Sequence, residues 1–185
     1  MKRYLSLGLV LAVTLTLSAS ASTFVAMSQD DLLKSSTAVV QGKVLQVDSY
    51  WNDTNQIIFS DVLVEVEDEV LGKADALITV RTVGGEVDGF HVDAHGFPTF
   101  DVDDRVLMFL QPDTKDSLKV AGYQQGLFRI VSDEAGVEMA IPATELETNI
   151  ITLDGQKASL PSAQTLDELK SSIVDDAAAL GLINR

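Results

Sequence analysis

The 185-residue chain carries 28 acidic and 13 basic residues, a formal net charge of −15, and no cysteine. A surface this negative repels nucleic-acid phosphates and anionic lipid headgroups, which proteins usually bind through clusters of lysine and arginine. The lack of cysteine excludes disulfides, thiolate nucleophiles and cysteine-ligated metals, so the fold has to be held by a hydrophobic core, for which the chain is long enough. We expect neutral, cationic or metal-bearing partners; the simpler interpretation is that the charge only keeps the protein soluble.

The first 21 residues have the pattern of an export signal. Lys2 and Arg3 precede an apolar run at residues 4–17, and a small-x-small sequence ends at Ala21. The apolar run is shorter than the ~20 residues that a membrane-spanning helix needs. We predict that this segment is a cleaved signal peptide, that the mature protein begins near Ser22 without a membrane span, and that it is periplasmic or extracellular.

A short N-terminal helix is predicted over residues 29–35. Ser28 is a good N-cap, Asp31 occupies the capping-box position, and Leu32 and Leu33 begin an apolar face. Strands are expected to follow at 38–47, 57–70, 76–83, 105–111, 118–122, 127–131 and 137–141, with a polar turn at 50–55.

Two of these strands determine the predicted architecture. Residues 57–70 alternate regularly and are far longer than the usual ~5 to 6 residues, which suggests a strand bent across two parts of a closed sheet. Residues 106–110 are continuously apolar, as in a strand buried on both faces. Gly42 interrupts the first strand and predicts a bulge or a close backbone approach. Residues 86–104 show no sustained period and are interpreted as a long loop over the barrel mouth or side.

The C-terminal segment changes to helical spacing. Thr165 is the expected N-cap with Glu168 as its capping-box partner, and Gly181 is the expected C-cap. The apolar stripe between them consists of Leu166, Leu169, Ile173, Ala177 and Leu180.

The predicted fold is mainly β: a small closed or partly open OB-like β-barrel of five to seven strands, with a short N-terminal helix and a C-terminal amphipathic helix. The predicted organisation is a signal peptide (1–21), a β-barrel domain (22–145) and a C-terminal extension (146–185) whose helix packs on the barrel.

Several short motifs occur in a fixed order along the chain. They are SSTAVVQG at 35–42, Trp51, the long strand at 57–70, LGK at 71–73, Gly84-Gly85, GFPTF at 96–100, the apolar strand at 106–110 and YQQGLF at 123–128. Over about residues 22–131 this order resembles a family of exported bacterial proteins of uncharacterised function.

The layout of AVVQGKV, the long strand and VLGK is also similar to the netrin-like domains of tissue metalloproteinase inhibitors, which are five-stranded OB-type barrels. This similarity implies the fold and, as an expectation, an interaction with an exported metalloprotease. Those inhibitors chelate the protease zinc through a mature N-terminal cysteine, which is missing here, so that mechanism does not carry over. An OB barrel also commonly has a helix where this chain has the glycine-containing segment 83–105.

The two histidines of the chain supply its sharpest chemical signal. If their segment is extended, His91, Asp93 and His95 point to one side and offer two imidazoles and a carboxylate to a divalent metal. The alternative is a pair of solvated histidines in a mobile loop. No cofactor is predicted apart from a divalent metal at this cluster, and no catalytic residue is assigned.

Four aromatic residues are candidates for contact with a partner. Tyr50 and Trp51 fall in the predicted early turn, and Phe90 and Phe97 fall in the long loop. Half-buried packing is the alternative for these side chains.

The leading functional hypothesis is an exported non-enzymatic binding module whose barrel rim and 86–104 loop meet a protein partner, such as an exported metalloprotease or another envelope protein. The alternative is a metal-dependent hydrolase that uses His91, Asp93 and His95. A purely structural envelope component is a third hypothesis, and the oligomeric state is left open.

Overall fold

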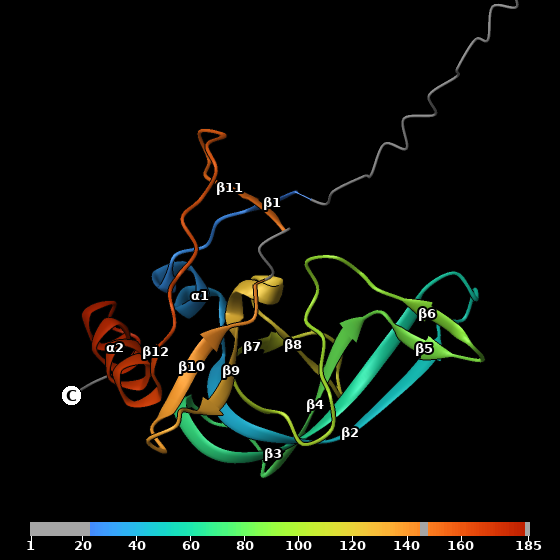
Figure 1. The fold of residues 1–185 in the computed structure, drawn as a ribbon, viewed down its shortest axis with the longest axis horizontal. Coiled ribbons are helices and arrows are strands. Elements are labelled where there is room, and N and C mark those ends of the chain that lie inside the picture. Colours follow the sequence, from blue (N-terminus) through green and yellow to red (C-terminus); the bar gives the residue numbers. More distant parts are fainter. Residues whose placement is uncertain (1–22, 145–147, 184–185) are drawn as a thin grey trace, which may run out of the picture.

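The computed structural model describes residues 23–144 and 148–183, and most of its regular structure is β-strand (Figure 1). In chain order the elements are β1 (Thr23–Val25), α1 (Gln29–Ser35), β2 (Ala38–Trp51), β3 (Ile58–Gly72), β4 (Leu77–Val83), β5 (Gly85–Val87), β6 (Phe90–Val92), β7 (Arg105–Pro112), β8 (Leu118–Val120), the 3₁₀ turn η1 (Tyr123–Gly126), β9 (Leu127–Ser132), β10 (Glu138–Pro142), β11 (Asn149–Ile151), β12 (Gln164–Thr165) and α2 (Leu166–Ala179). The predicted signal peptide, residues 1–21, lies outside the described residues. Among the helices that are described, none is long and apolar enough to cross a bilayer.

Five of the strands close into a barrel. β2 pairs with β3, β3 with β4, β4 with β8 and β8 with β7, and β7 returns to β2. The β4–β8 pair is parallel and the other four pairs are antiparallel. This is the connectivity of a five-stranded Greek-key barrel, and it confirms the predicted OB-like fold. β9, β10 and β12 extend the sheet outward from β7.

Bulges bend the long strand β2 around the barrel. Its register against β3 shifts at Gln41/Gly42 and again at Val44/Gln46, and each bulge adds local twist. A Cβ atom on Gly42 would lie 2.6 Å from the carbonyl oxygen of Glu65. The predicted bulge and close approach at Gly42 are therefore confirmed, because only glycine leaves room for the β3 backbone.

β2 continues beyond its predicted end at residue 47. Tyr50 pairs with Phe59 and Trp51 with Ile58, and the turn begins only at Asn52, whose N–H donates to the carbonyl of Ile57 (2.8 Å). The predicted turn at 50–55 was wrong at its start because tyrosine and tryptophan favour a strand wherever a partner strand lies beside them. Such a partner is not visible in the local pattern.

Alternate residues of the central strands face two hydrophobic cores. Inside the barrel, Val40 and Met108 belong to a fully buried cluster. On the outside, Leu107 and Phe109 belong to a second cluster, to which both helices contribute. β7 lies between the two cores, which explains why residues 106–110 are completely buried, as predicted.

Both helices begin at the predicted capping boxes. At α1 the N–H of Asp31 donates to Ser28 Oγ (3.2 Å) and the N–H of Ser28 donates to Asp31 Oδ2 (3.0 Å). Thr165 and Glu168 make the same reciprocal pair at α2. These bonds satisfy backbone donors that a helix leaves unpaired at its N-terminus.

α2 packs its apolar stripe on the outer face of the barrel, as predicted. Leu169 and Ile173 are completely buried in the outer core. The helix ends at Ala179 with Leu180 as its C-cap, and Gly181 follows with φ +72°, where the N–H of Leu182 donates to the carbonyl of Ala177 (2.9 Å). The described part of the predicted extension is thus bound to the barrel by a shared core.

The first and last thirds of the described chain also pair directly, because β1 runs parallel to β11. Within the last third, β12 pairs with β10. Asn149 Nδ2 donates to Thr23 Oγ1 (2.9 Å) beside the first of these pairs. None of β1, β11 and β12 was predicted, because strands of two or three residues carry too little periodicity to stand out.

Candidate functional site

A small hairpin lies over one end of the barrel. β5 and β6 pair through a two-residue turn in which Asp88 has φ +52° and Gly89 has φ +79°, the backbone of a type I′ turn. The segment 86–104 was predicted to lack regular structure, and this hairpin corrects that prediction. The signal that could have found it is the Asp-Gly dipeptide between β-prone residues.

Two adjacent glycines allow the hairpin to lie against the barrel wall. A Cβ on Gly85, where φ is +128°, would lie 2.3 Å from Ser49 Oγ and 2.4 Å from Ser60 Oγ. Ser60 Oγ is within 2.8 Å of Ser49 Oγ and donates to the carbonyl of Gly84 (2.7 Å). These hydroxyls connect β2, β3 and the start of the hairpin.

A cavity of about 510 Å³ opens between this hairpin, the segment that follows it and strands β2 to β4. We call it the mouth pocket; it is lined by Val47, Ser49, Ser60, Val62 and residues 82–86, 91–94 and 98–102. Thr82 Oγ1 donates to the carbonyl of Pro98 (2.7 Å) and holds the covering segment to β4. The volume is within the range of ligand sites in proteins, about 300 to 1,000 Å³.

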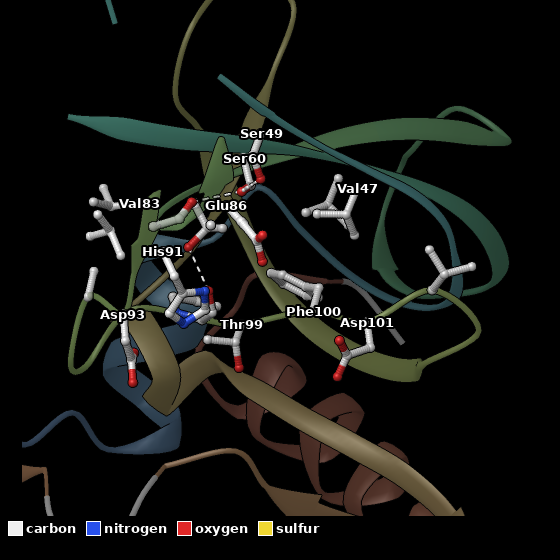
Figure 2. Close-up of a pocket in the computed structure, with 18 residues that line it drawn as sticks. Val47, Ser49, Ser60, Val83, Glu86, His91, Asp93, Thr99, Phe100 and Asp101 are labelled. Carbon is white, nitrogen blue, oxygen red and sulfur yellow. Dashed lines mark hydrogen bonds between the residues drawn. The ribbon is translucent and has the colours of Figure 1, made fainter. Parts of the chain in front are cut away.

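The lining of the mouth pocket combines apolar and acidic groups. Figure 2 shows Glu86, His91 and Phe100 together in the middle of the pocket, with Asp93 and Asp101 toward opposite ends of the view. Phe100 is buried, whereas the three carboxylates are exposed. Among the residues that the structure describes, no lysine or arginine lines this cavity. The site therefore offers apolar contact to a ligand and favours positive charge on it.

His91 and Asp93 line the mouth pocket, but the predicted metal cluster is not assembled. The extended segment ends with β6 at Val92, and His95 lies in a turn in which the N–H of Phe97 donates to the carbonyl of Ala94 (2.9 Å). Side-chain alternation needs a continuous strand, so it cannot align His95 with His91 here. Across residues 23–144 and 148–183 no group of three or more His, Cys, Asp or Glu side chains could hold a metal ion.

The four candidate aromatic residues occupy three different places. Trp51 and Phe90 meet edge to face beside the mouth pocket, with ring centroids 5.9 Å apart, and Phe90 is 62% exposed. Phe97 packs instead against Tyr123 (5.0 Å) near η1. Of the four, only half-buried Trp51 and exposed Phe90 form an aromatic pair at the barrel mouth.

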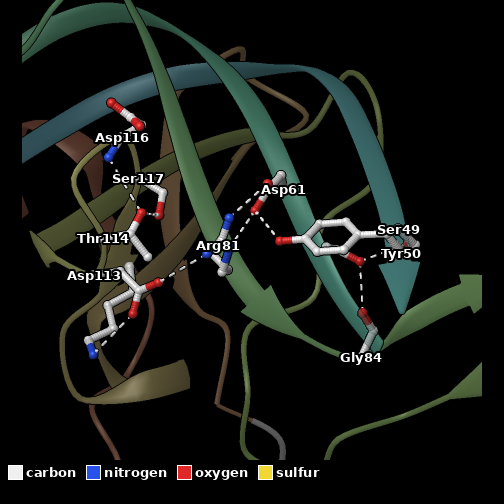
Figure 3. Close-up of polar contacts among 11 residues, drawn as sticks. Ser49, Tyr50, Asp61, Arg81, Gly84, Asp113, Thr114, Asp116 and Ser117 are labelled. Atoms are coloured by element: carbon white, nitrogen blue, oxygen red, sulfur yellow. Dashed lines mark hydrogen bonds and ion pairs between the residues drawn. The ribbon is translucent and has the colours of Figure 1, made fainter. Parts of the chain in front are cut away.

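Tyr50 belongs to a polar network that sequence reasoning missed (Figure 3). Arg81 donates to both carboxylate oxygens of Asp61 (2.7 and 3.0 Å), and the Tyr50 hydroxyl donates to Asp61 Oδ1 (3.3 Å). Arg81 also reaches Asp113 (3.9 Å), which pairs with Lys119 (3.3 Å). The network ties strands β2, β3 and β4 to the segment between β7 and β8.

The electrostatics of this network are those of a structural ion pair. The hydrogen bond to Asp61 raises the pKa of Arg81 above its ordinary value, and burial raises the pKa of the Tyr50 phenol. Both shifts keep the groups in their usual ionisation states at neutral pH. No local sequence signal predicts this network, because its members are far apart in the chain.

A scan against models of protein families and a search of curated proteins find no match for this chain.

Proposed function

We propose that the chain is an exported, non-enzymatic binding module that receives a protein partner at the mouth pocket. The observation that carries the proposal is the cavity itself, which combines apolar and acidic lining groups and to which the described chain contributes no lysine or arginine. Interface cores are enriched in aromatic side chains and depleted of charge, and the exposed Phe90, packed on half-buried Trp51 beside the pocket, fits that composition.

Export is supported by the sequence of the first 21 residues. They combine a basic start, an apolar run and a small-x-small end. A strongly acidic chain without cysteine also suits a protein that stays soluble outside the cytoplasm without disulfides.

An exported metalloprotease is the specific partner that the netrin-like resemblance suggests. The OB-like connectivity agrees with that resemblance at the level of the fold, and a fold alone does not determine function. Since the chain has no cysteine, it cannot chelate the protease zinc as those inhibitors do, and we propose that it restrains such a protease through contact with the barrel mouth. For the alternative, a metal-dependent hydrolase, His91 and Asp93 line the mouth pocket, but the described residues form no group of three ligands there.

The proposal is tested by crosslinking capture from the exported fraction of the producing cell. The wild-type protein and a Phe90→Ser variant are compared, with Leu153→Ser as the matched control because Leu153 is 93% exposed and lies away from the mouth pocket. We expect Phe90→Ser to reduce capture of a specific protein by about tenfold or more, as for an aromatic hot spot, and Leu153→Ser to leave it unchanged.

Capture of no exported protein, or capture that Phe90→Ser does not weaken, would contradict the proposal. Inhibition of an exported metalloprotease by the wild type but not by Phe90→Ser would identify such a protease as the partner.

A further inference from the structure

One edge of β2 is unpaired where the strand passes the mouth pocket. β2 pairs with β7 only as far as Lys43 and Arg105. The segment just before β7 makes its last backbone hydrogen bonds to β2 at Val44. The Val44 N–H donates to the carbonyl of Asp104 (2.8 Å), and the Val44 carbonyl accepts from the N–H of Asp103 (3.0 Å). From residue 46 to residue 51, the described chain provides β3 on one side and no backbone hydrogen bond on the other. We call this stretch the free edge of β2.

The residues that present unpaired backbone groups follow from the register. The carbonyl of Ile58 accepts from Gly84 on the far side of β3 (2.8 Å), so its antiparallel partner Trp51 does not bond to it. Because bonded and unbonded pairs alternate, Trp51, Ser49 and Val47 turn their N–H and C=O groups away from β3. These three residues therefore offer a hydrogen-bonding template of the kind to which a further strand can add.

The free edge and the mouth pocket are adjacent. Val47 and Ser49 line the cavity from the β2 side, and Phe100 and Asp101 line it from the covering segment, which has separated from β2 beyond Asp103. A strand added to β2 places alternate side chains on the face that Val47 and Ser49 occupy. One such side chain would enter the cavity.

The charge of the cavity selects the chemistry of that side chain. Glu86, Asp93 and Asp101 line the cavity with exposed carboxylates, no lysine or arginine among the described residues lines it, and the whole segment 84–104 contains neither. Lysine and arginine combine an apolar stem with a cationic head, which matches a cavity lined by both apolar and acidic groups.

We propose that the partner binds by strand addition: an extended segment pairs with the free edge of β2 and places a lysine or arginine side chain in the mouth pocket. This rests on the proposed binding function and adds the mode of binding and the residue class that is recognised. Backbone pairing supplies affinity, and the pocket supplies selectivity for the basic side chain.

Amide hydrogen exchange of the protein, measured residue by residue by NMR, tests strand addition directly. The probes are short synthetic peptides of alternating threonine and valine with either lysine or glutamate at the centre. On addition of the lysine peptide we expect exchange at Val47, Ser49 and Trp51 to slow by about tenfold or more. The intervening amides of Asp48 and Tyr50, which face β3, are expected not to change and serve as internal controls.

Titration of the two peptides tests the recognised charge. We expect the lysine peptide to bind about tenfold more tightly than the glutamate peptide at low salt, and the difference to shrink as salt is raised. The double variant Glu86→Gln, Asp101→Asn should remove this preference, whereas Glu134→Gln, a change of an exposed carboxylate in the β9–β10 turn, should retain it.

The inference is overturned if neither peptide binds, if the glutamate peptide binds as well as the lysine peptide, or if exchange slows elsewhere but not at the free edge. Should capture of a partner depend on Phe90 while the free-edge amides stay unprotected in that complex, the binding function stands and strand addition fails.

Discussion

The two halves of β2 have different surroundings although they form one continuous strand. Residues 38–44 lie between β3 and β7 and are almost entirely buried, whereas residues 45–51 pair, among the described strands, with β3 alone and are exposed or half-buried (Figure 1). The first half closes the barrel and separates its two cores. The second half projects past the ring and borders the mouth pocket. It follows that stability is concentrated in the first half, and that the second half can present backbone and aromatic groups without weakening the fold.

The largest change in stability is expected from Phe109. This residue of β7 is completely buried and pairs with Val39 in the first half of β2. Phe109→Ala should lower the free energy of unfolding by about 4 kcal/mol, because it leaves a cavity in the outer core. Urea denaturation measures the change. The matched variant at the barrel mouth, Phe90→Ala, should change stability by less than about 0.5 kcal/mol, and a loss as large as that of Phe109→Ala would break the distinction.

A smaller effect is expected at Gly42, also in the first half. Gly42→Ala places a methyl group 2.6 Å from the carbonyl oxygen of Glu65, and the required backbone shift should cost about 2 kcal/mol. Gln46→Ala, on the exposed half, is the control and should stay within about 0.5 kcal/mol of the wild type in the same denaturation assay. Equal stability of the two variants would show that the close approach is not a constraint.

The smallest change in stability is expected from the carboxylate of Glu67, which links β3 to the first half of β2 and to β7. Glu67 accepts from Gln41 Nε2 (2.7 Å) and from Arg105 Nη2 (2.9 Å), and the hydrogen bond from Arg105 lowers its pKa below the ordinary 4.5. A carboxyl whose pKa is lower in the folded than in the unfolded state stabilises the fold above the unfolded pKa. That contribution is lost as the pH falls through the folded pKa.

We therefore expect Glu67→Gln to lose less stability than the wild type between about pH 6 and about pH 3, by about 0.5 kcal/mol, since solvent screens this pair. Denaturation at each pH measures the difference. Glu134→Gln should follow the wild-type pH dependence, and a Glu67→Gln profile that does the same would remove the proposed contribution.

Local signals carried the sequence prediction where it was confirmed. The capping boxes at Ser28 and Thr165 need only a few adjacent residues, and the alternation in β3 and the apolar run in β7 need only one strand each. The barrel could be inferred from these elements because a sheet with so long a strand has to bend.

Features that depend on distant partners were missed. The extension of β2 to Trp51 requires β3 beside it, and the Arg81–Asp61–Asp113 network joins three separate segments. In the candidate site, the location of the 86–104 segment over the barrel was predicted, and His91 and Asp93 do line its pocket. The unpaired edge beside them could not be predicted, because it depends on where the chain leaves β2, which no local pattern records.

The pairing of β1 with β11 has a consequence for the order in which the chain folds. Thr23 meets Asn149 across 126 positions of sequence. Closing so large a loop has a considerable entropic cost, and contacts this remote tend to form late in folding. Since synthesis proceeds from the N-terminus, residues 23–25 can pair only after residues 149–151 have been made, and by then all five strands of the barrel are available.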